Sequence, residues 1–356
     1  MFRTGPGFLS TLQNQLEKIP YEKLQLIDKN KGLDLQSLMR HLLKPQDYSI
    51  DSPDATPDSD VTKYDDIQES VFDAGLDAIE GGKVAYCILA GGAGTRMGAS
   101  KGTLRIPGLD ISLLGIKLIQ SVPSKHVWVM TSPSNDHEIR DHMSSLTFKG
   151  GAKTFQQYES VRLTPDNCLH LEDNEPSFYP CGHGDVIPAL KESGILQSFL
   201  DEGGKYIVIV NVDNVLASLD PALVGHHIQA NKPVTCEVVE KLPTDSGGLL
   251  CNVAGVNQVV EQFRITGDFD ATRFNWLNTN SMIVDADINF DSVRWSWHRV
   301  KKNVNGKLVI QYERLLQDLT STFQTSYVEV PRYLRFMPIK KHDDLAKAYE
   351  ILNGNK

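Results

Sequence analysis

The chain has 356 residues, an apolar fraction of 40% and a net charge of −9. These values are ordinary for a globular protein, and the length allows one large α/β unit with extensions. General nucleic-acid binders are more often basic, and the sequence contains no dense run of lysine and arginine. We therefore expect no nucleic-acid partner.

The five cysteines form neither a CxxC pair nor a zinc-ligand spacing. Their odd number and low density argue against a disulfide framework, so a reducing, cytoplasmic setting is expected. The N-terminal residues lack the apolar run of a signal peptide. Since no stretch of about 18 apolar residues occurs, a membrane association is not expected either.

The first predicted unit covers residues 1–75 and combines a helical N-terminal extension with a linker. Leu9, Leu12, Leu16 and Ile19 recur at helical spacing, which predicts helix up to about residue 43. Residues 44–63 are rich in Pro, Asp and Ser and are expected to form a loop.

Residues 71–79 are typical of a short amphipathic helix, after which the pattern changes. Short apolar runs at 84–90, 127–130 and 206–210 are typical of buried parallel strands, and residues 112–120 are typical of a helix. This alternation predicts an α/β fold with a doubly wound, mostly parallel, Rossmann-like sheet. We expect a catalytic domain over 76–330 and a short C-terminal segment over 331–356.

A glycine-rich turn follows the first of these strands, in the sequence AGGAGTRMG at residues 90–98. Glycines let the backbone approach a phosphate, and Arg96 and Lys101 supply cations beside them. The spacing is G-x-G-x-x-x-G, which differs from the dinucleotide fingerprint, and Gly102 after Lys101 excludes a Walker A loop. A turn without a ligand remains the alternative from the glycines alone.

Asp213 follows the strand at 206–210, and the carboxyl ends of parallel strands are where α/β sheets bind ligands. Magnesium prefers one or two carboxylates together with water and substrate phosphates. Asp213 is therefore the candidate magnesium ligand, the alternative being a turn residue that makes an Asx hydrogen bond.

A second glycine-rich turn, PCGHGD at residues 180–185, precedes an apolar helix that starts near Val186. Asp185 is placed to cap that helix. His183 would then face whatever the turn binds, although a lone turn histidine is often structural.

The order and spacing of these segments resemble the UDP-sugar pyrophosphorylases, the family of UTP–glucose-1-phosphate uridylyltransferase and UDP-N-acetylglucosamine pyrophosphorylase. The resemblance extends over roughly residues 80 to 350. The similar segments are LAGGAGTRMG (89–98) with Lys101, FQQ (155–157), PCGHGD (180–185), NVDN (211–214), CEVVEK (236–241), SGGL (246–249), QVVE (258–261), LNTN (277–280), QYE (311–313) and PRYLRFMPIKK (331–341).

The resemblance implies transfer of a uridylyl group from UTP to a sugar 1-phosphate, with release of pyrophosphate and with Mg²⁺ as the cofactor held by Asp213. It implies catalytic roles for Arg96, Lys101 and Lys340. The nucleotide would be bound by Leu89, Ala90, Gly91, Gly92, Gly94, Thr95, Gln157 and Gly182, with Gln156 as the alternative reader of uracil. The sugar phosphate would be bound by His183, Asn211, Gly248, Glu261, Asn278 and Asn280.

The identity of the sugar stays open within this resemblance. Three segments are similar to the glucose enzymes: GHGD (182–185), NTN (278–280) and the tail (331–341). Two segments are closer to the acetylglucosamine enzymes: VVEK (238–241) and NVDN (211–214). We expect glucose 1-phosphate to be the substrate. Three alternatives remain: acetylglucosamine 1-phosphate, a different base or phosphate acceptor, and a non-catalytic nucleotide-sugar-binding protein. No segment resembles the C-terminal β-helix domain that such families use to oligomerise, so a monomer is compatible with the sequence.

Overall fold

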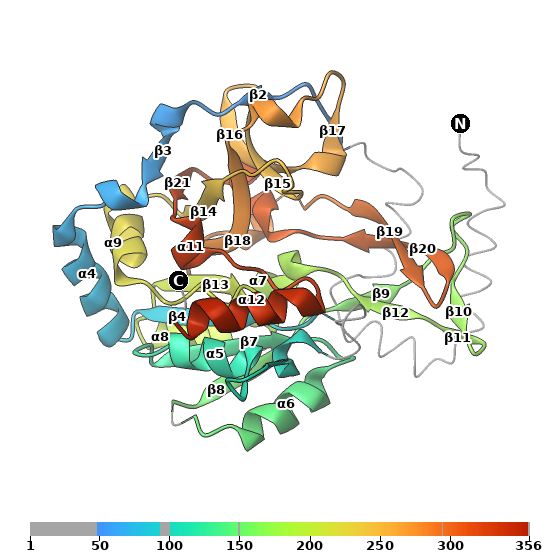
Figure 1. The fold of residues 1–356 in the computed structure, drawn as a ribbon, viewed down its shortest axis with the longest axis horizontal. Coiled ribbons are helices and arrows are strands. Elements are labelled where there is room, and N and C mark those ends of the chain that lie inside the picture. Colours follow the sequence, from blue (N-terminus) through green and yellow to red (C-terminus); the bar gives the residue numbers. More distant parts are fainter. Residues whose placement is uncertain (1–47, 93–99, 149, 294, 355–356) are drawn as a thin grey trace.

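A large sheet lies at the centre of the computed structural model, which describes residues 48–92, 100–148, 150–293 and 295–354 (Figure 1). Within the described residues it has eleven strands, eight of them in one hydrogen-bonded path. In spatial order this path is β3 (Val61–Lys63), β21 (Thr325–Glu329), β14 (Val234–Glu240), β18 (Trp276–Asp285), β13 (Tyr206–Asn211), β4 (Val84–Leu89), β7 (His126–Thr131) and β8 (Ala152–Gln156).

The sheet is largely parallel, with β18 as the antiparallel strand of the path. β13, β4, β7 and β8 run parallel to one another, and so do β3, β21 and β14, while β18 is antiparallel to both of its neighbours. The carboxyl ends of β4 and β13 therefore lie at one edge, and the beginning of β18 lies beside them.

Helices cover both faces of the sheet, because the strands are apolar on both sides. In β4, Cys87 and Leu89 belong to one buried cluster, whereas Tyr86 and Ile88 belong to the other. The first cluster includes α7 (Val186–Glu192) and α8 (Ile195–Asp201). The second includes α4 (Glu69–Glu80), α5 (Leu113–Gln120), α6 (Asp136–Ser145), α9 (Pro221–Ala230) and α12 (His342–Leu352).

The direction of winding changes at β4. The chain passes outward from β4 through β7 to β8, and then returns to the other side of β4 as β13. Such a reversal leaves a crevice beyond the carboxyl ends of the two strands, which is where ligands bind in open α/β sheets. The predicted strands at 84–90, 127–130 and 206–210 and the predicted helices at 71–79 and 112–120 are confirmed.

The loop predicted for residues 44–63 is wrong in its last part. β1 (Ile50–Asp51), β2 (Asp54–Ala55) and β3 occur there, and β3 pairs in parallel with β21 at the end of the path. Val61 is buried on the sheet, which the polar composition around it concealed. The helix predicted up to residue 43 lies outside the described residues.

Two hairpins lie near the candidate site. β15 (Gly248–Val253) pairs with β16 (Val256–Glu261) beside the beginning of β18. β19 (His298–Val304) and β20 (Lys307–Glu313) form a ribbon that extends away from the sheet (Figure 1), and the short turn η8 (Leu316–Asp318) follows it.

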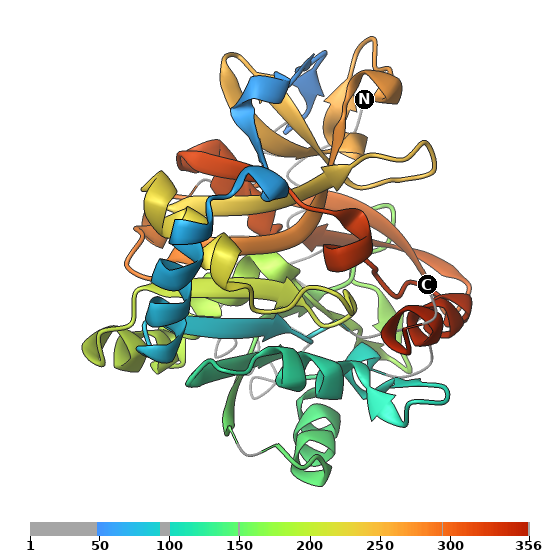
Figure 2. The ribbon, with the colours of Figure 1, turned by 60° about the vertical axis from the view of Figure 1, so that its left-hand side comes forward.

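The C-terminal segment crosses back over the sheet edge. It contains α11 (Arg332–Arg335) and α12, and α12 lies beside the small hairpin of β5 (Arg105–Ile106) and β6 (Ile111–Ser112) in both ribbon views (Figures 1 and 2). A Cβ at Gly108, in that hairpin, would lie 2.7 Å from the ring of Tyr349, so the two approach closely.

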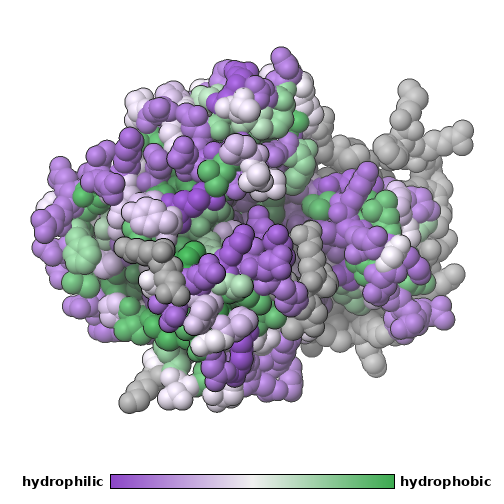
Figure 3. All heavy atoms as spheres, viewed as in Figure 1, coloured by the Kyte–Doolittle hydropathy of each residue, from purple (hydrophilic) through white to green (hydrophobic). Residues whose placement is uncertain are grey.

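None of the helices in the described ranges has the length and apolar character needed to cross a bilayer. On the face shown in Figure 3, hydrophilic residues predominate and apolar residues are scattered among them.

Candidate active site

The nucleotide-side residues lie where β4 and β13 end next to each other. The carbonyl of Leu89 accepts a hydrogen bond from Val212 N–H at 3.1 Å, which joins the glycine-rich turn to the Asp213 turn. Gly91 lies against Gln157, because a Cβ at Gly91 would be 2.1 Å from Gln157 Nε2. A side chain at position 91 would therefore displace the amide of Gln157, and the structure brings two residues predicted to bind the nucleotide into contact.

Buried polar side chains hold this edge in place. Asn135, at the start of α6, donates from Nδ2 to the carbonyl of Ala90 at 2.9 Å, and its Oδ1 accepts from Ser132 N–H at 2.8 Å. Asn135 is not predicted by any local pattern, since only the sheet order places it against the Ala90 turn. Gly92, the last described residue of the turn, is exposed.

Lys101 and Asp213 form an ion pair at the centre of the edge. Lys101 Nζ lies 2.5 Å from Asp213 Oδ2, and both side chains are partly exposed. The pair is therefore accessible from solvent and is not sealed inside the protein. The structure thus places two of the predicted phosphate- and metal-binding groups in direct contact.

The short turn that carries Lys101, η3 (Lys101–Thr103), is anchored on α6 through Glu138. Ser100 Oγ donates to Glu138 Oε2 at 2.5 Å, and Thr103 Oγ1 donates to Oε1 at 2.8 Å. Burial opposes the charged form of Glu138, but these hydrogen bonds prevail and lower its pKa. Glu138 therefore stays ionised and holds the turn from behind.

The C-terminal segment lies directly against the Asp213 turn. Ile339 N–H donates to the carbonyl of Asp213 at 2.8 Å, and Met337 N–H donates to Asn214 Oδ1 at 2.9 Å. Lys340, the next residue, is exposed, and no described residue forms an ion pair with its side chain. The predicted late lysine is thus brought beside Asp213, although the sequence separates the two by more than a hundred positions.

A buried ion pair secures this segment. Arg335 is 4% exposed and its guanidinium contacts both carboxylate oxygens of Glu237 on β14, at 3.0 and 2.8 Å. Arg335 Nη1 also donates to the carbonyl of Ser218 at 2.9 Å. A forked contact of this kind fixes orientation as well as distance. Both residues lie in segments that resemble the family, but the pair itself was not predicted.

The GHGD turn packs on the backbone of Arg314, at the end of β20. A Cβ at Gly182 would lie 2.4 Å from the Arg314 carbonyl, and one at Gly184 would lie 2.8 Å from its carbonyl carbon. Gly182 also has φ +104°, which favours glycine. Close packing thus accounts for both glycines, whether or not Gly182 also contacts uracil.

The predicted capping role of Asp185 is wrong. Its side chain makes no capping hydrogen bond to α7 and instead forms a buried ion pair with Arg314. Burial raises the pKa of Asp185 to about 6, with Arg314 opposing that shift. A buried carboxylate without a cation would lower the stability of the fold. The Asp185 side chain is therefore oriented toward Arg314 and not toward the N-terminus of α7.

His183 is held in a defined orientation by the backbone of η8. Leu316 N–H donates to His183 Nδ1 at 2.9 Å, so Nδ1 is an acceptor and the proton of the neutral ring lies on Nε2. Burial lowers the pKa of His183 to about 4. The neutral imidazole is therefore the stable form, with Nε2–H as its remaining donor.

Three predicted sugar-side asparagines lie together at the junction of β13 and β18. Asn280 Nδ2 donates to Asn211 Oδ1 at 3.0 Å, and Asn280 N–H donates to Asn278 Oδ1 at 3.0 Å. Asn280 has φ +61°, a conformation that asparagine tolerates better than most residues. Its Oδ1 is buried without a hydrogen-bond partner among the described residues.

Gly248 and Glu261 face each other on the β15–β16 hairpin, next to Asn278. A Cβ at Gly248 would lie 3.4 Å from Glu261 Oε1 and from Asn278 Cβ. Glu261 Oε1 accepts from Gln317 Nε2 at 2.6 Å, and burial raises the pKa of Glu261. The sugar-side prediction thus identified neighbouring residues but missed Gln317.

A further buried lysine, Lys117 on α5, supports the loop after Asp213. Its Nζ donates to the carbonyl of Ala217 at 2.7 Å, and Tyr86 OH donates to the same carbonyl at 2.6 Å. Burial lowers the pKa of Lys117 well below its usual value. It was missed because its spacing is that of an ordinary amphipathic helix.

Three predicted site residues, Gly94, Thr95 and Arg96, lie outside the described residues. The donor set that the structure does describe suits magnesium, because one partly exposed carboxylate at a strand end matches the preference of Mg²⁺ for few carboxylates and many phosphate and water oxygens. No group of three or more His, Cys, Asp or Glu side chains in the described ranges is arranged to hold a metal by itself.

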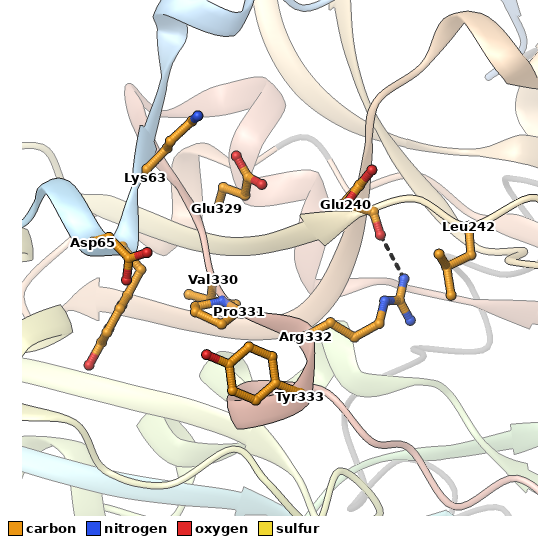
Figure 4. A pocket seen from close by; sticks show the side chains of 10 residues that line it. Lys63, Asp65, Glu240, Leu242, Glu329, Val330, Pro331, Arg332 and Tyr333 are labelled. Atoms are coloured by element: carbon orange, nitrogen blue, oxygen red, sulfur yellow. Dashed lines mark hydrogen bonds between the residues drawn. The ribbon is translucent and has the colours of Figure 1, made fainter.

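A hollow of about 430 Å³ lies near β3 and the segment before α11 (Figure 4). Its lining includes Lys63, Glu240, Glu329 and Tyr333, and Arg332 donates to the carbonyl of Glu240 at 2.8 Å. None of the described candidate site residues lines it.

The fold and the site together define an α/β protein with a phosphate-type site at the reversal point of its sheet. A sequence model described as UTP–glucose-1-phosphate uridylyltransferase matches residues 35–351, and the chain belongs to this family. It is 27% identical to the UTP–glucose-1-phosphate uridylyltransferase of Hordeum vulgare over 93% of its length and 76% of that protein. It is 28% identical to the enzyme of the same name from Pyrus pyrifolia over 74% of its length and 61% of that protein.

Solved structures share the fold. A UDP-glucose pyrophosphorylase from Leishmania major, in complex with UDP-glucose, is 19% identical and matches with a TM-score of 0.74 over 90% of this chain and 77% of that one. A UDP-N-acetylglucosamine pyrophosphorylase from Trypanosoma brucei is 23% identical and matches with a TM-score of 0.71 over 90% and 76%. These matches establish a mixed α/β architecture with a largely parallel central sheet.

Proposed function

We propose that the chain is a UTP–glucose-1-phosphate uridylyltransferase, which forms UDP-glucose and pyrophosphate. The observation that carries this proposal is the ion pair of Lys101 with Asp213, with the segment bearing Lys340 hydrogen-bonded to the Asp213 turn. Two polyanionic substrates can approach each other only where cations offset their repulsion. Family membership supplies the chemistry that fits this arrangement.

In the proposed reaction, a phosphate oxygen of glucose 1-phosphate attacks the α-phosphorus of UTP. The bond from the α-phosphorus to the bridging oxygen breaks, and pyrophosphate leaves with that electron pair. No side-chain nucleophile is needed, since such transfer depends mainly on positioning and charge stabilisation. Lys101 stabilises the charge that develops at the α-phosphate, and Lys340 holds the incoming sugar phosphate.

The remaining residues orient the substrates. Gly91, Gln157 and Gly182 bind the uracil side, and His183 donates from Nε2–H toward the sugar phosphate. Gly248, Glu261 and the three asparagines bind the sugar. Arg96, with the backbone of its turn, is proposed to hold the β- and γ-phosphates.

Asp213 is proposed to be the protein ligand of Mg²⁺, which would supply charge neutralisation between phosphate oxygens. Lys101 contacts only Oδ2 of Asp213, so Oδ1 would be available to hold the metal. The exposure of both side chains is compatible with this arrangement.

The proposal also covers the fold class, the domain division and the location of the protein. The reversal of strand order at β4 supports a doubly wound, Rossmann-like sheet. We propose a division into an N-terminal extension (1–75), a catalytic domain (76–330) and a C-terminal segment (331–356) that supplies Lys340. A cytoplasmic location completes the proposal.

A pyrophosphate-release assay tests the proposed activity. UTP, CTP and ATP are each combined with glucose 1-phosphate, N-acetylglucosamine 1-phosphate, galactose 1-phosphate and a sugar alcohol phosphate. The expected result is release with UTP and glucose 1-phosphate at the highest kcat/KM. Release with N-acetylglucosamine 1-phosphate instead would replace the proposed sugar, and binding of UDP-glucose without any release would indicate a non-catalytic binding protein.

A further inference from the structure

One short turn, η8, contacts two side chains that the proposed function assigns to the sugar phosphate. Its Leu316 N–H donates to His183 Nδ1 at 2.9 Å, and its Gln317 Nε2 donates to Glu261 Oε1 at 2.6 Å. His183 comes from the GHGD turn and Glu261 from the end of β16, so η8 links two otherwise separate parts of the site.

The side chain of Gln317 is buried with one polar atom unpaired, an arrangement that packing alone would not favour. It is 2% exposed, and its Oε1 has no hydrogen-bond partner among the described residues. Leaving a buried amide oxygen unpaired is unfavourable, and an apolar side chain of similar size would avoid it. The carboxylate of Glu261 fixes the amide orientation, because the opposite orientation would place two oxygens together. The arrangement therefore serves the contact with Glu261.

The turn is itself held firmly by Asp318, which is also 2% exposed. Asp318 Oδ2 accepts from Ser296 N–H at 2.8 Å and lies 3.5 Å from His298 Nε2. Asp318 Oδ1 lies 3.6 Å from Arg264 Nη1. Contacts with two separate segments, residues 296–298 and Arg264, restrict the turn, so the position of Gln317 is restricted as well.

We infer that Gln317 is a positioning residue for the sugar: it holds Glu261 Oε1, which leaves Glu261 Oε2 directed to accept a sugar hydroxyl. This inference rests on the proposed function and extends it to a residue outside the predicted site. A carboxylate with one oxygen already bonded loses less rotational freedom when the hydroxyl binds. Gly248 packs beside that carboxylate, since a Cβ there would lie 3.4 Å from Oε1 and 2.7 Å from Val259 Cγ1.

Replacing Gln317 with Leu tests this assignment, because leucine keeps most of the volume and removes the donor. The KM for glucose 1-phosphate is expected to rise about tenfold, while the KM for UTP changes less than about twofold. Gln197→Leu is the matched control, since Gln197 Nε2 also donates to a carboxylate, Asp201 Oδ1 at 2.8 Å, but on the exposed surface of α8. The control is expected to leave both KM values unchanged.

Gln317→Glu provides a readout that a merely structural role would not produce. At pH 8 the new carboxylate repels Glu261, whereas near pH 6 the pair can share one proton and restore the hydrogen bond. The other charged groups that act on Glu261 are His298, Arg264 and Glu313, and they are identical in all variants. The KM for glucose 1-phosphate of Gln317→Glu, relative to wild type, should therefore fall as pH is lowered from 8 to 6, while that of Gln317→Leu should not.

Calorimetry with UDP-glucose separates this inference from the proposed function. If the wild type releases no pyrophosphate with any sugar phosphate, the proposed activity fails, and the Kd of UDP-glucose for wild type and Gln317→Leu still tests the positioning role. A tenfold weaker Kd supports the inference. Unchanged sugar affinity, or equal loss of UTP and sugar affinity, overturns it, and the pH response of Gln317→Glu decides the question if Gln317→Leu does not fold.

Discussion

Lys101 Nζ lies 2.5 Å from Asp213 Oδ2, although the two residues are 112 positions apart in the chain. The contact forms where β4 and β13 end side by side, and it pairs a lysine with a carboxylate that are both partly exposed. It is the geometric basis of the proposed transfer.

The first prediction concerns Asp213. Asp213→Asn should lower kcat/KM by at least about a hundredfold, because a neutral amide is a poor magnesium ligand and no longer balances Lys101. Steady-state kinetics over a range of Mg²⁺ concentrations measure this effect. Asp245→Asn removes a carboxylate that pairs with Arg332 at 2.5 Å away from the site, and it should retain normal kinetics. Near-normal activity of Asp213→Asn at limiting Mg²⁺ would show that Asp213 is only a turn residue.

The second prediction concerns Lys340, whose side chain is exposed beside the Asp213 turn. Lys340→Ala should raise the KM for glucose 1-phosphate about tenfold or more, with a smaller effect on UTP binding measured by calorimetry. Lys341→Ala is the matched control, since Lys341 is the adjacent exposed lysine and pairs only loosely, at 3.9 Å, with Asp343. Equal loss of UTP and sugar affinity would assign Lys340 to the nucleotide instead.

The third prediction concerns the contact of Gly91 with Gln157. Gly91→Ala would place a methyl group 2.1 Å from Gln157 Nε2 and 2.9 Å from the Thr131 carbonyl, so the amide must move. The kcat/KM for UTP should fall about tenfold, and the preference for UTP over ATP should shrink, because a site that hydrogen-bonds a base rejects mismatched edges. If kcat/KM falls by the same factor for UTP and for ATP, the result would show that Gln157 does not recognise the base.

The fourth prediction concerns the buried pair of Arg335 and Glu237. Arg335→Met leaves Glu237 buried without its cation and should lower the free energy of unfolding by about 3–5 kcal/mol. Urea denaturation measures this difference. Arg332→Met breaks the more exposed pair with Asp245 and should cost about 1 kcal/mol or less. Similar losses for both variants would mean that the Glu237 contact contributes little to holding the C-terminal segment.

The fifth prediction concerns pH. The pKa of His183 is lowered to about 4 in the folded protein, so the unfolded chain binds the additional proton as pH falls below about 6.5. The contribution of His183 to stability is therefore present above that pH and is lost as pH falls toward 4. His183→Asn lacks this titration, and the stability of wild type relative to this variant should fall by about 1 kcal/mol from pH 8 to pH 5.5. A constant difference across this range would show that His183 is not buried in its neutral form.

Much of the fold follows from local sequence patterns. Continuous apolar runs at 84–90, 127–130 and 206–210 predicted the inner strands, because strands covered on both faces bury every residue. The polar stretch before residue 64 was predicted to be a loop, and the strand β3 in it was missed. This strand lies at the end of the path, and Val61 is its one buried residue. The prediction that Asp185 caps α7 was wrong for a similar reason, because its partner Arg314 comes from a distant segment of the chain.

The sequence by itself determined the inner strands at 84–90, 127–130 and 206–210 and the family to which the chain belongs, since these depend on neighbouring residues and on the order of motifs. The tertiary structure alone decided which side chains meet: Lys101 with Asp213, Arg335 with Glu237, and Gln317 with Glu261. It also decided that His183 Nδ1 is an acceptor, because the donor is a backbone N–H from η8. Such contacts join segments tens to over a hundred residues apart. They depend on the order in which the strands assemble, which no local periodicity contains.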